Sequence, residues 1–229
     1  MKILTFIIIL FSTMSKAQDF ANFGKYQKQN QEVISQNIVP NSVLMGDSIT
    51  EGWFATDPGF FTKNNFVGRG IGGQVTSQML LRFQEDVIKL KPKRVIILAG
   101  TNDIAENQGP ISLEKVFGNI VSMAELAKAN NIKVVLCSVL PAYDFPWRKD
   151  MQPSDKVIAL NKMIKDYALK NHINYVDYHS VLKDEKNGLS KEIAEDGIHP
   201  TKLGYEKMEA TLMFYVNLQI FQVKIFNLF

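Results

Sequence analysis

Two short blocks of this sequence contain residue types that can perform acyl transfer when they meet. Ser48 lies in residues 46–50 (GDSIT), and Asp196 and His199 lie in residues 196–200 (DGIHP). A serine hydroxyl is a weak nucleophile until a base takes its proton, and the base needs an orienting carboxylate. Taken alone, each block has a plainer explanation, a serine or an aspartate that caps a turn or helix beside a surface histidine. Together they predict a nucleophile, a base and its orienting acid.

A glycine-rich block offers backbone N–H groups. Residues 68–73 (GRGIGG) hold four glycines in six positions, a pattern that permits close backbone approach or positive φ. The same spacing fits a dinucleotide-binding fingerprint, but such a fingerprint needs an acid about 20 residues later at the end of the next strand. Here the next strong strand candidate ends in residues 99–102 (AGTN), without that acid. An exposed N–H offered to an anion is the better interpretation.

A third block, residues 100–103 (GTND), contributes an amide. The side chain of Asn102 can donate a hydrogen bond to a developing oxyanion. Its alternative role is to close its own loop as an Asx-turn.

These blocks follow segments that are predicted to be strands of a parallel sheet. Apolar runs without in/out alternation alternate along the chain with stretches of helical period, which favours one open parallel sheet between two layers of helices. In such folds ligands bind beyond the carboxyl ends of the strands. The strand candidates are residues 43–45, 65–67, 94–99, 133–139 and 173–176, and the clearest helical stretches are 76–90, 116–127 and 157–167.

The blocks GDSIT, GRGIGG, GTND and DGIHP, in this order, closely resemble those of the SGNH hydrolases, also called GDSL-type esterases. The resemblance covers about residues 42–205 and is strongest to the platelet-activating-factor acetylhydrolase and bacterial carbohydrate acetylesterase branches. It implies Ser48 as nucleophile, His199 as general base and then acid, and Asp196 as its orienting partner. It also implies a three-layer α/β/α fold whose five-stranded parallel sheet has flavodoxin-like strand order.

The resemblance further implies an oxyanion hole, the set of donors that holds the charged carbonyl oxygen. Its members would be the N–H of Ser48, the N–H of Gly73 and the side-chain amide of Asn102. The sequence leaves Gly70 and Gly72 open as alternatives to Gly73. No metal and no organic cofactor is expected.

The start of the chain has the pattern of a secretory signal peptide. Residues 1–17 combine a positive charge at Lys2, an apolar run and a small-residue cleavage site near Ala17. We therefore expect a secreted or periplasmic protein with no stable membrane span after cleavage; a retained membrane anchor is the alternative. Cleavage would lower the formal charge from +3 to +1, which gives no electrostatic case for nucleic acid. The single cysteine, Cys137, can form no internal disulfide.

The remainder is expected to be one hydrolase domain, residues 18–213, followed by an atypical apolar tail, residues 214–229. In the tail Phe214, Val216, Leu218 and Ile220 alternate like a strand. Its role and the oligomeric state are not predicted.

Aromatic residues favour a carbohydrate ester as the substrate. Trp53, Tyr143 and Trp147 could stack on a sugar ring, or the rings could simply pin the loop to the core. Arg69 could contact a polar substrate or support the glycine block. The expected function is that of a serine esterase that removes acyl groups, with acetyl as the favoured group. Lysophospholipids and thioesters are alternatives within the same chemistry.

Two further classes of protein stay open. A metal-dependent hydrolase would hold a cation with Asp47, Asp103, Asp196 and His199. A non-catalytic carbohydrate-binding protein would normally have lost one of the four blocks, and all four are present.

Overall fold

The computed structural model of the chain describes residues 19–226, with side chains as far as residue 216. Its centre is a five-stranded sheet in the order β2-β1-β3-β4-β5, and every neighbouring pair is parallel. The strands are β1 (Ser42–Gly46), β2 (Phe66–Gly70), β3 (Arg94–Ile97), β4 (Lys133–Cys137) and β5 (Asn174–Val176). The predicted parallel sheet and its flavodoxin-like order are confirmed.

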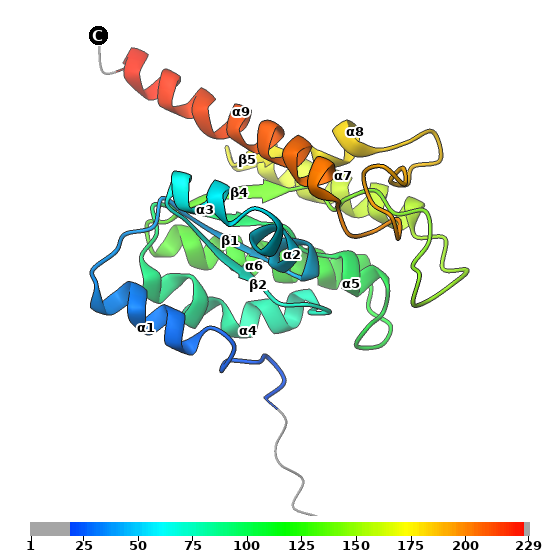
Figure 1. Cartoon of the computed structure of the whole chain (residues 1–229), viewed down its shortest axis with the longest axis horizontal. Coiled ribbons are helices and arrows are strands. Elements are labelled where there is room, and N and C mark those ends of the chain that lie inside the picture. Colours follow the sequence, from blue (N-terminus) through cyan, green and yellow to red (C-terminus); the bar gives the residue numbers. More distant parts are fainter. Residues whose placement is uncertain (1–18, 227–229) are drawn as a thin grey trace, which may run out of the picture.

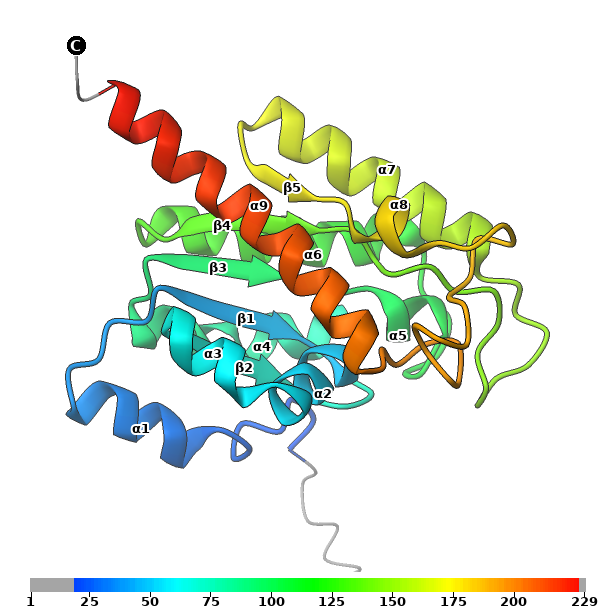
Figure 2. The ribbon, with the colours of Figure 1, turned by 45° about the horizontal axis from the view of Figure 1, so that its top comes forward.

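Helices cover both faces of this sheet (Figures 1 and 2). The helices are α1 (Gln27–Ser35), α2 (Ser48–Thr56), α3 (Pro58–Asn64), α4 (Thr76–Asp86), α5 (Thr101–Ile104), α6 (Leu113–Ala129), α7 (Ser154–Lys170), α8 (Tyr178–Leu182) and α9 (Lys202–Phe226). In Figure 2, α9 crosses in front of the sheet while α4 and α6 lie behind it. The predicted three-layer α/β/α architecture is confirmed.

The strands are apolar on both sides because each side faces a separate core. In β1, Val43 and Met45 belong to the core beneath α4, α6 and α7, and Leu44 belongs to the core beneath α2, α3, α8 and α9. All three side chains are at most 2% exposed. Burying such a side chain contributes roughly 1.5–3 kcal/mol. The two cores hold the carboxyl end of β1, and the loop that follows it, in a fixed place.

Two predicted boundaries differ from the structure. Residues 68–70 of the glycine block are the end of β2 and not a loop. A Cβ on Gly70 would lie 2.2 Å from the backbone nitrogen of Glu51, so glycine is needed where β2 passes the start of α2. The predicted helical stretch 76–90 breaks at Val87 (φ −127°) and continues as a 3₁₀ turn over residues 88–90.

The strand-like pattern of the apolar tail is a wrong prediction. Helix α9 runs without a break from Lys202 to Phe226. The reason is that helical spacing also fits the segment: Tyr205, Met208, Leu212 and Val216 are all buried against the sheet. Within residues 19–226, no helix combines the length and apolar character needed to cross a membrane. The predicted signal peptide lies outside the described residues.

Candidate active site

Ser48 lies at the sharp turn from β1 into α2. Asp47 caps the helix by accepting a 2.9 Å hydrogen bond from the N–H of Ile49, and Ser48 is the first helical residue. A Cβ on Gly46 would lie 2.1 Å from Oγ1 of Thr50, so the turn requires glycine there. The first N–H groups of a helix have no intrahelical acceptor. The Ser48 N–H is therefore available to an anion.

The capping carboxylate beside Ser48 is buried. Asp47 is 1% exposed. Burial raises the pKa of Asp47 to about 6, although the hydrogen bond from the Ile49 N–H acts in the opposite direction. The carboxylate is committed to the helix cap.

The loop before α9 brings His199 to Ser48. Nε2 of His199 lies 2.9 Å from Oγ of Ser48, and Nδ1 lies 2.6 Å from Oδ2 of Asp196. The other carboxylate oxygen, Oδ1, accepts the N–H groups of Ile198 and His199 at 2.9 and 2.8 Å. One aspartate thus shapes its own turn and orients the imidazole. With the Nδ1 proton donated to Asp196, Nε2 is free to accept the hydroxyl proton of Ser48.

The carboxylate of Asp196 is stabilised in its ionised form. Partial burial alone would raise its pKa, but hydrogen bonds from the His199 ring and from the N–H groups of His199 and Ile198 outweigh burial and lower it. The side chains of His199 and Asp196 are each 40% exposed. The pair is reachable from solvent, and Asp196 stays charged through neutral pH.

Asn102 lies against the residue that follows the glycine block. It is 3% exposed, in α5 directly after β3. Its Nδ2 donates to the carbonyl of Gln74 at 3.1 Å. Because β1 lies between β2 and β3, this contact joins the loops on both sides of Ser48.

Among the candidate glycines, the geometry favours Gly73. Gly70 lies within β2, and the N–H of Gly72 donates to Oε2 of Glu51 at 2.7 Å. Gly73 has a left-handed φ of +74°, and its N–H has no acceptor among the residues that the structure describes. The N–H of Gly73 is therefore the available one in this block.

The carboxylates proposed for a metal site are engaged elsewhere. Asp103 accepts the N–H and the hydroxyl of Thr76 at 2.9 and 2.6 Å, which ties α5 to the start of α4. Burial raises the pKa of Asp103. Residues 19–216 contain no group of three or more His, Cys, Asp or Glu side chains placed to hold a metal ion. The geometry does not group Asp47, Asp103, Asp196 and His199 as ligands.

Two of the predicted substrate contacts are wrong. Trp53 is 1% exposed; it stacks on Tyr205 and donates to Oε1 of Glu209 at 2.9 Å, so it joins α2 to α9. Arg69 is 4% exposed; its Nε donates to Oδ1 of Asn30 at 2.8 Å and its guanidinium lies over the ring of Tyr26. Both are structural residues because the helices packed over them exclude solvent.

The other two predicted contacts lie at the surface. Trp147 is 44% exposed and its ring centroid is 6.1 Å from that of His199. Its indole N–H donates to Oδ1 of Asn107 at 3.0 Å. Tyr143 is 61% exposed and packs against the loop at Gly188. Of the four predicted contacts, Trp147 is the one that lies beside His199.

A buried arginine that the sequence did not single out joins the pieces of the site. The Nη2 of Arg82 donates to the carbonyls of Gly46 and Arg69, both at 3.0 Å, and its Nε donates to Oε1 of Gln74 at 2.6 Å. Asp86 pairs with its Nη1 at 2.8 Å. Arg82 thus holds the ends of β1 and β2 and the residue after Gly73. In the sequence it appears as one charged residue of an amphipathic stretch.

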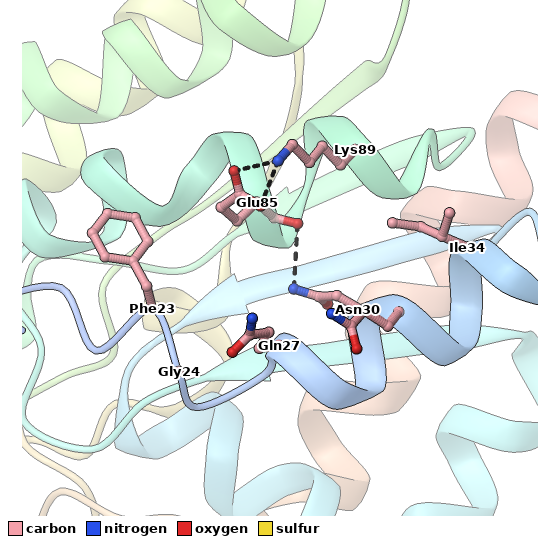
Figure 3. A pocket seen from close by; sticks show the side chains of 8 residues that line it. Phe23, Gly24, Gln27, Asn30, Ile34, Glu85 and Lys89 are labelled. Carbon is pink, nitrogen blue, oxygen red and sulfur yellow. Dashed lines mark hydrogen bonds and ion pairs between the residues drawn. The ribbon is translucent and has the colours of Figure 1, made fainter.

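A hollow of about 570 Å³ lies between α1 and the end of α4 (Figure 3). Part of its polar lining is engaged internally: Lys89 pairs with Glu85 at 2.6 Å, and Asn30 donates to the Glu85 carbonyl at 3.3 Å. Its lining residues are Phe23, Gly24, Gln27, Asn30, Gln31, Ile34, Glu85 and Lys89. None of them belongs to the predicted site.

The chain matches a known protein family over most of its length. The model of the GDSL-like Lipase/Acylhydrolase family covers residues 44–207, from β1 to the start of α9. The chain belongs to this family. The GDSL-like lipase of Bacteroides thetaiotaomicron VPI-5482 has the same fold, with a TM-score of 0.83 and 46% identity over 88% of this chain and 100% of that one. The predicted family is confirmed, and with it the class of carboxylic ester hydrolase at the level of the family.

Two curated relatives match over part of their length. Lipoprotein YqeF of Bacillus subtilis (strain 168), itself uncharacterized, is 38% identical over 138 residues, or 59% of this chain. A multidomain esterase of Ruminococcus flavefaciens is 32% identical over 153 residues, or 65% of this chain. The chain spans only 56% and 18% of these two proteins.

Proposed function

We propose that this GDSL-family protein is a serine esterase in which Ser48, His199 and Asp196 form the catalytic triad. The observation that carries the proposal is the pair of hydrogen bonds on His199, 2.9 Å to Ser48 and 2.6 Å to Asp196. They leave the imidazole with one acceptor nitrogen, and that nitrogen faces the hydroxyl.

The reaction follows from this arrangement. Ser48 Oγ bonds to the ester carbonyl carbon as its proton moves to Nε2 of His199. The N–H groups of Ser48 and Gly73 and the amide of Asn102 hold the negative carbonyl oxygen. His199 returns the proton to the departing alcohol, and an acyl-enzyme remains. Water then attacks, with His199 again taking a proton, and the acid leaves as Ser48 regains its hydrogen.

The proposed substrates are short-chain esters of a carbohydrate, and acetyl esters are the preferred ones. Two features of the site support this class. His199 and Asp196 are each 40% exposed, so a bulky alcohol can remain partly in solvent. The exposed ring of Trp147 beside His199 offers a face on which a sugar can stack. Lysophospholipids and thioesters are the rival substrates.

Export is part of the proposal. It is supported by the signal-peptide pattern of residues 1–17 and by a relative named as a lipoprotein. The one cysteine of this sequence, Cys137, is buried in β4, far from the cleavage site along the chain. We therefore propose a secreted or periplasmic protein released near Ala17, which mass spectrometry of the mature N-terminus tests.

The activity is tested by hydrolysis of p-nitrophenyl acetate with wild type, Ser48→Ala and Ser122→Ala. Ser122 is a half-buried serine on α6, outside the predicted site, and serves as the matched control. We expect Ser48→Ala to lose activity, Ser122→Ala to keep it, and an added chelator to change neither. Activity that survives Ser48→Ala or vanishes with chelator would contradict the proposal in favour of a metal-dependent hydrolase.

The substrate class is tested by comparing esters that differ in their acyl chain or in their alcohol. Acetyl, butyryl and octanoyl esters of p-nitrophenol, an acetylated xylo-oligosaccharide and a lysophospholipid are compared by kcat/KM. The proposal expects the acetyl ester and the oligosaccharide to be preferred. A preference for octanoyl or lysophospholipid would replace the substrate class and leave the triad in place.

A further inference from the structure

Asn107 connects Asn102 to Trp147 through both ends of its side chain. Its Nδ2 donates to Oδ1 of Asn102 at 2.7 Å, and its Oδ1 accepts the indole N–H of Trp147 at 3.0 Å. Its own N–H also donates to the backbone carbonyl of Asn102 at 3.0 Å. The side chain therefore lies between the proposed oxyanion donor and the exposed ring beside His199.

The direction of this hydrogen-bond chain is set at both ends. An indole N–H can only donate and a backbone carbonyl can only accept. Trp147 therefore requires Oδ1 of Asn107 on its side, which turns Nδ2 of Asn107 toward Asn102. At the far end the carbonyl of Gln74 accepts Nδ2 of Asn102 at 3.1 Å. Reversing either carboxamide would put two donors or two acceptors face to face.

The orientation of Asn102 decides whether it can stabilise an oxyanion. A carboxamide presents two N–H groups on one side and an oxygen on the other. With Oδ1 occupied by Asn107, the NH₂ group gives one hydrogen to Gln74 and keeps the second for a ligand. In the reversed orientation, the oxygen would repel the charge that it should hold.

We propose that Asn107 is a positioning residue that keeps the Asn102 amide aimed into the oxyanion hole and links this orientation to the Trp147 loop. The inference rests on the proposed function, because it assigns Asn107 a role through Asn102. The loop is fixed from the other side as well: Nη1 of Arg148 donates to the carbonyls of Ala105 and Glu106 at 2.7 and 2.8 Å. These hydrogen bonds tie residues 105–107 to residues 147–148.

The sharpest variant is Asn107→Asp, which has almost the same shape. It keeps an acceptor for Trp147 but replaces the donor toward Asn102 with an acceptor. We expect kcat on p-nitrophenyl acetate to fall by about 10²–10³, as for Asn102→Ala, with KM changed far less. Asn130→Asp, an exposed asparagine at the end of α6, is the matched control and should keep wild-type kcat.

The double variant Asn102→Ala/Asn107→Asp separates orientation from charge. If Asn107 acts through Asn102, the double variant is as active as Asn102→Ala alone, because the effects of coupled residues do not add. If the new carboxylate simply repels the oxyanion, the second substitution lowers kcat further and the inference fails. Asn107→Leu, neutral and of similar size, should also lower kcat in the wild-type background and have no effect in the Asn102→Ala background.

The two proposals can fail separately. If Asn102→Ala lowers kcat while Asn107→Asp and Asn107→Leu keep it near wild type, the positioning role is overturned and the esterase proposal stands. If Asn102→Ala itself keeps wild-type kcat, the proposed oxyanion hole is wrong. Thermal unfolding of each variant establishes that the compared proteins are folded.

Discussion

Oγ of Ser48 lies 2.9 Å from Nε2 of His199 although 151 residues separate them in the chain. The packing of α9 on α2 brings them together. The hydroxyl of Tyr205 donates to the carbonyl of Ile49 at 2.9 Å, and the indole N–H of Trp53 donates to Glu209. These contacts fix the loop that carries His199 over the turn that carries Ser48. Ordinary helix packing therefore sets the distance between the proposed nucleophile and its base.

Asp196→Asn should impair catalysis while preserving the fold. The N–H groups of Ile198 and His199 would hold the remaining oxygen of the asparagine, so its NH₂ group would face Nδ1 of His199. That donor favours the tautomer with a proton on Nε2, which cannot accept from Ser48. We expect kcat to fall by about 10²–10⁴. Steady-state hydrolysis of p-nitrophenyl acetate measures it.

Asp177→Asn is the matched control for this substitution. Asp177 caps α8 by accepting the N–H of Ser180 and lies outside the site. The Asp177→Asn substitution should leave kcat unchanged. Equal activity of Asp196→Asn and wild type would remove Asp196 from the triad.

Asp47→Asn should change how stability depends on pH. Burial raises the pKa of Asp47 to about 6 from 3.8, so the folded protein binds this proton more tightly than the unfolded chain. The stability of wild type relative to Asp47→Asn, which retains a capping oxygen, should therefore fall as pH rises from about 4 to about 6. The full change is about 3 kcal/mol, and it levels off above pH 6. Denaturant unfolding of both proteins at pH 4 and pH 7 measures it, and a constant difference would mean that folding does not raise the pKa of Asp47.

Most of the candidate site could be predicted because three of its four chemical blocks lie at the carboxyl end of a buried strand. The carboxyl ends of parallel strands meet at one edge of the sheet, so GDSIT, GRGIGG and GTND converge whatever the details of packing. The strand order follows from the family resemblance. The pairing of Asp196 with His199 is local, within four residues, and sequence spacing is enough to indicate it.

Side-chain exposure could not be predicted, since it depends on helices that are distant in the sequence. Trp53 resembles a surface aromatic beside Ser48, but α9, whose Glu209 is 156 residues away, covers it. The alternation at Phe214 and Val216 fits a strand, but the same apolar segment also fits the 3.6-residue period of a helix, which is what the chain forms there. Asn107 belongs to none of the four blocks, and only its hydrogen bonds single it out.

Gly70→Ala should damage the site from within the sheet. A Cβ at Gly70 would lie 2.2 Å from the backbone nitrogen of Glu51, and backbone cannot give way as a flexible side chain can. We expect a loss of several kcal/mol in unfolding free energy, or displacement of α2 with loss of activity. Thermal unfolding and p-nitrophenyl acetate hydrolysis measure these effects.

Gly118→Ala is the same chemical change at another position, and it should stabilise the protein instead of destabilising it. Gly118 lies within α6, and a Cβ there meets nothing within 4 Å. Alanine should raise the unfolding free energy by about 0.5–1 kcal/mol and leave activity unchanged. Similar stabilities for Gly70→Ala and Gly118→Ala would contradict the close approach of β2 to α2.

Covalent labelling with a fluorophosphonate tests the central claim, that His199 activates Ser48 as a nucleophile, most directly. Intact-mass spectrometry and peptide mapping of wild type, Ser48→Ala and His199→Ala would follow the label. The account predicts one adduct on wild type, located on Ser48, none on Ser48→Ala, and much slower labelling of His199→Ala. An enzyme that hydrolyses p-nitrophenyl acetate without being labelled at Ser48, or that is labelled equally fast without His199, would contradict it.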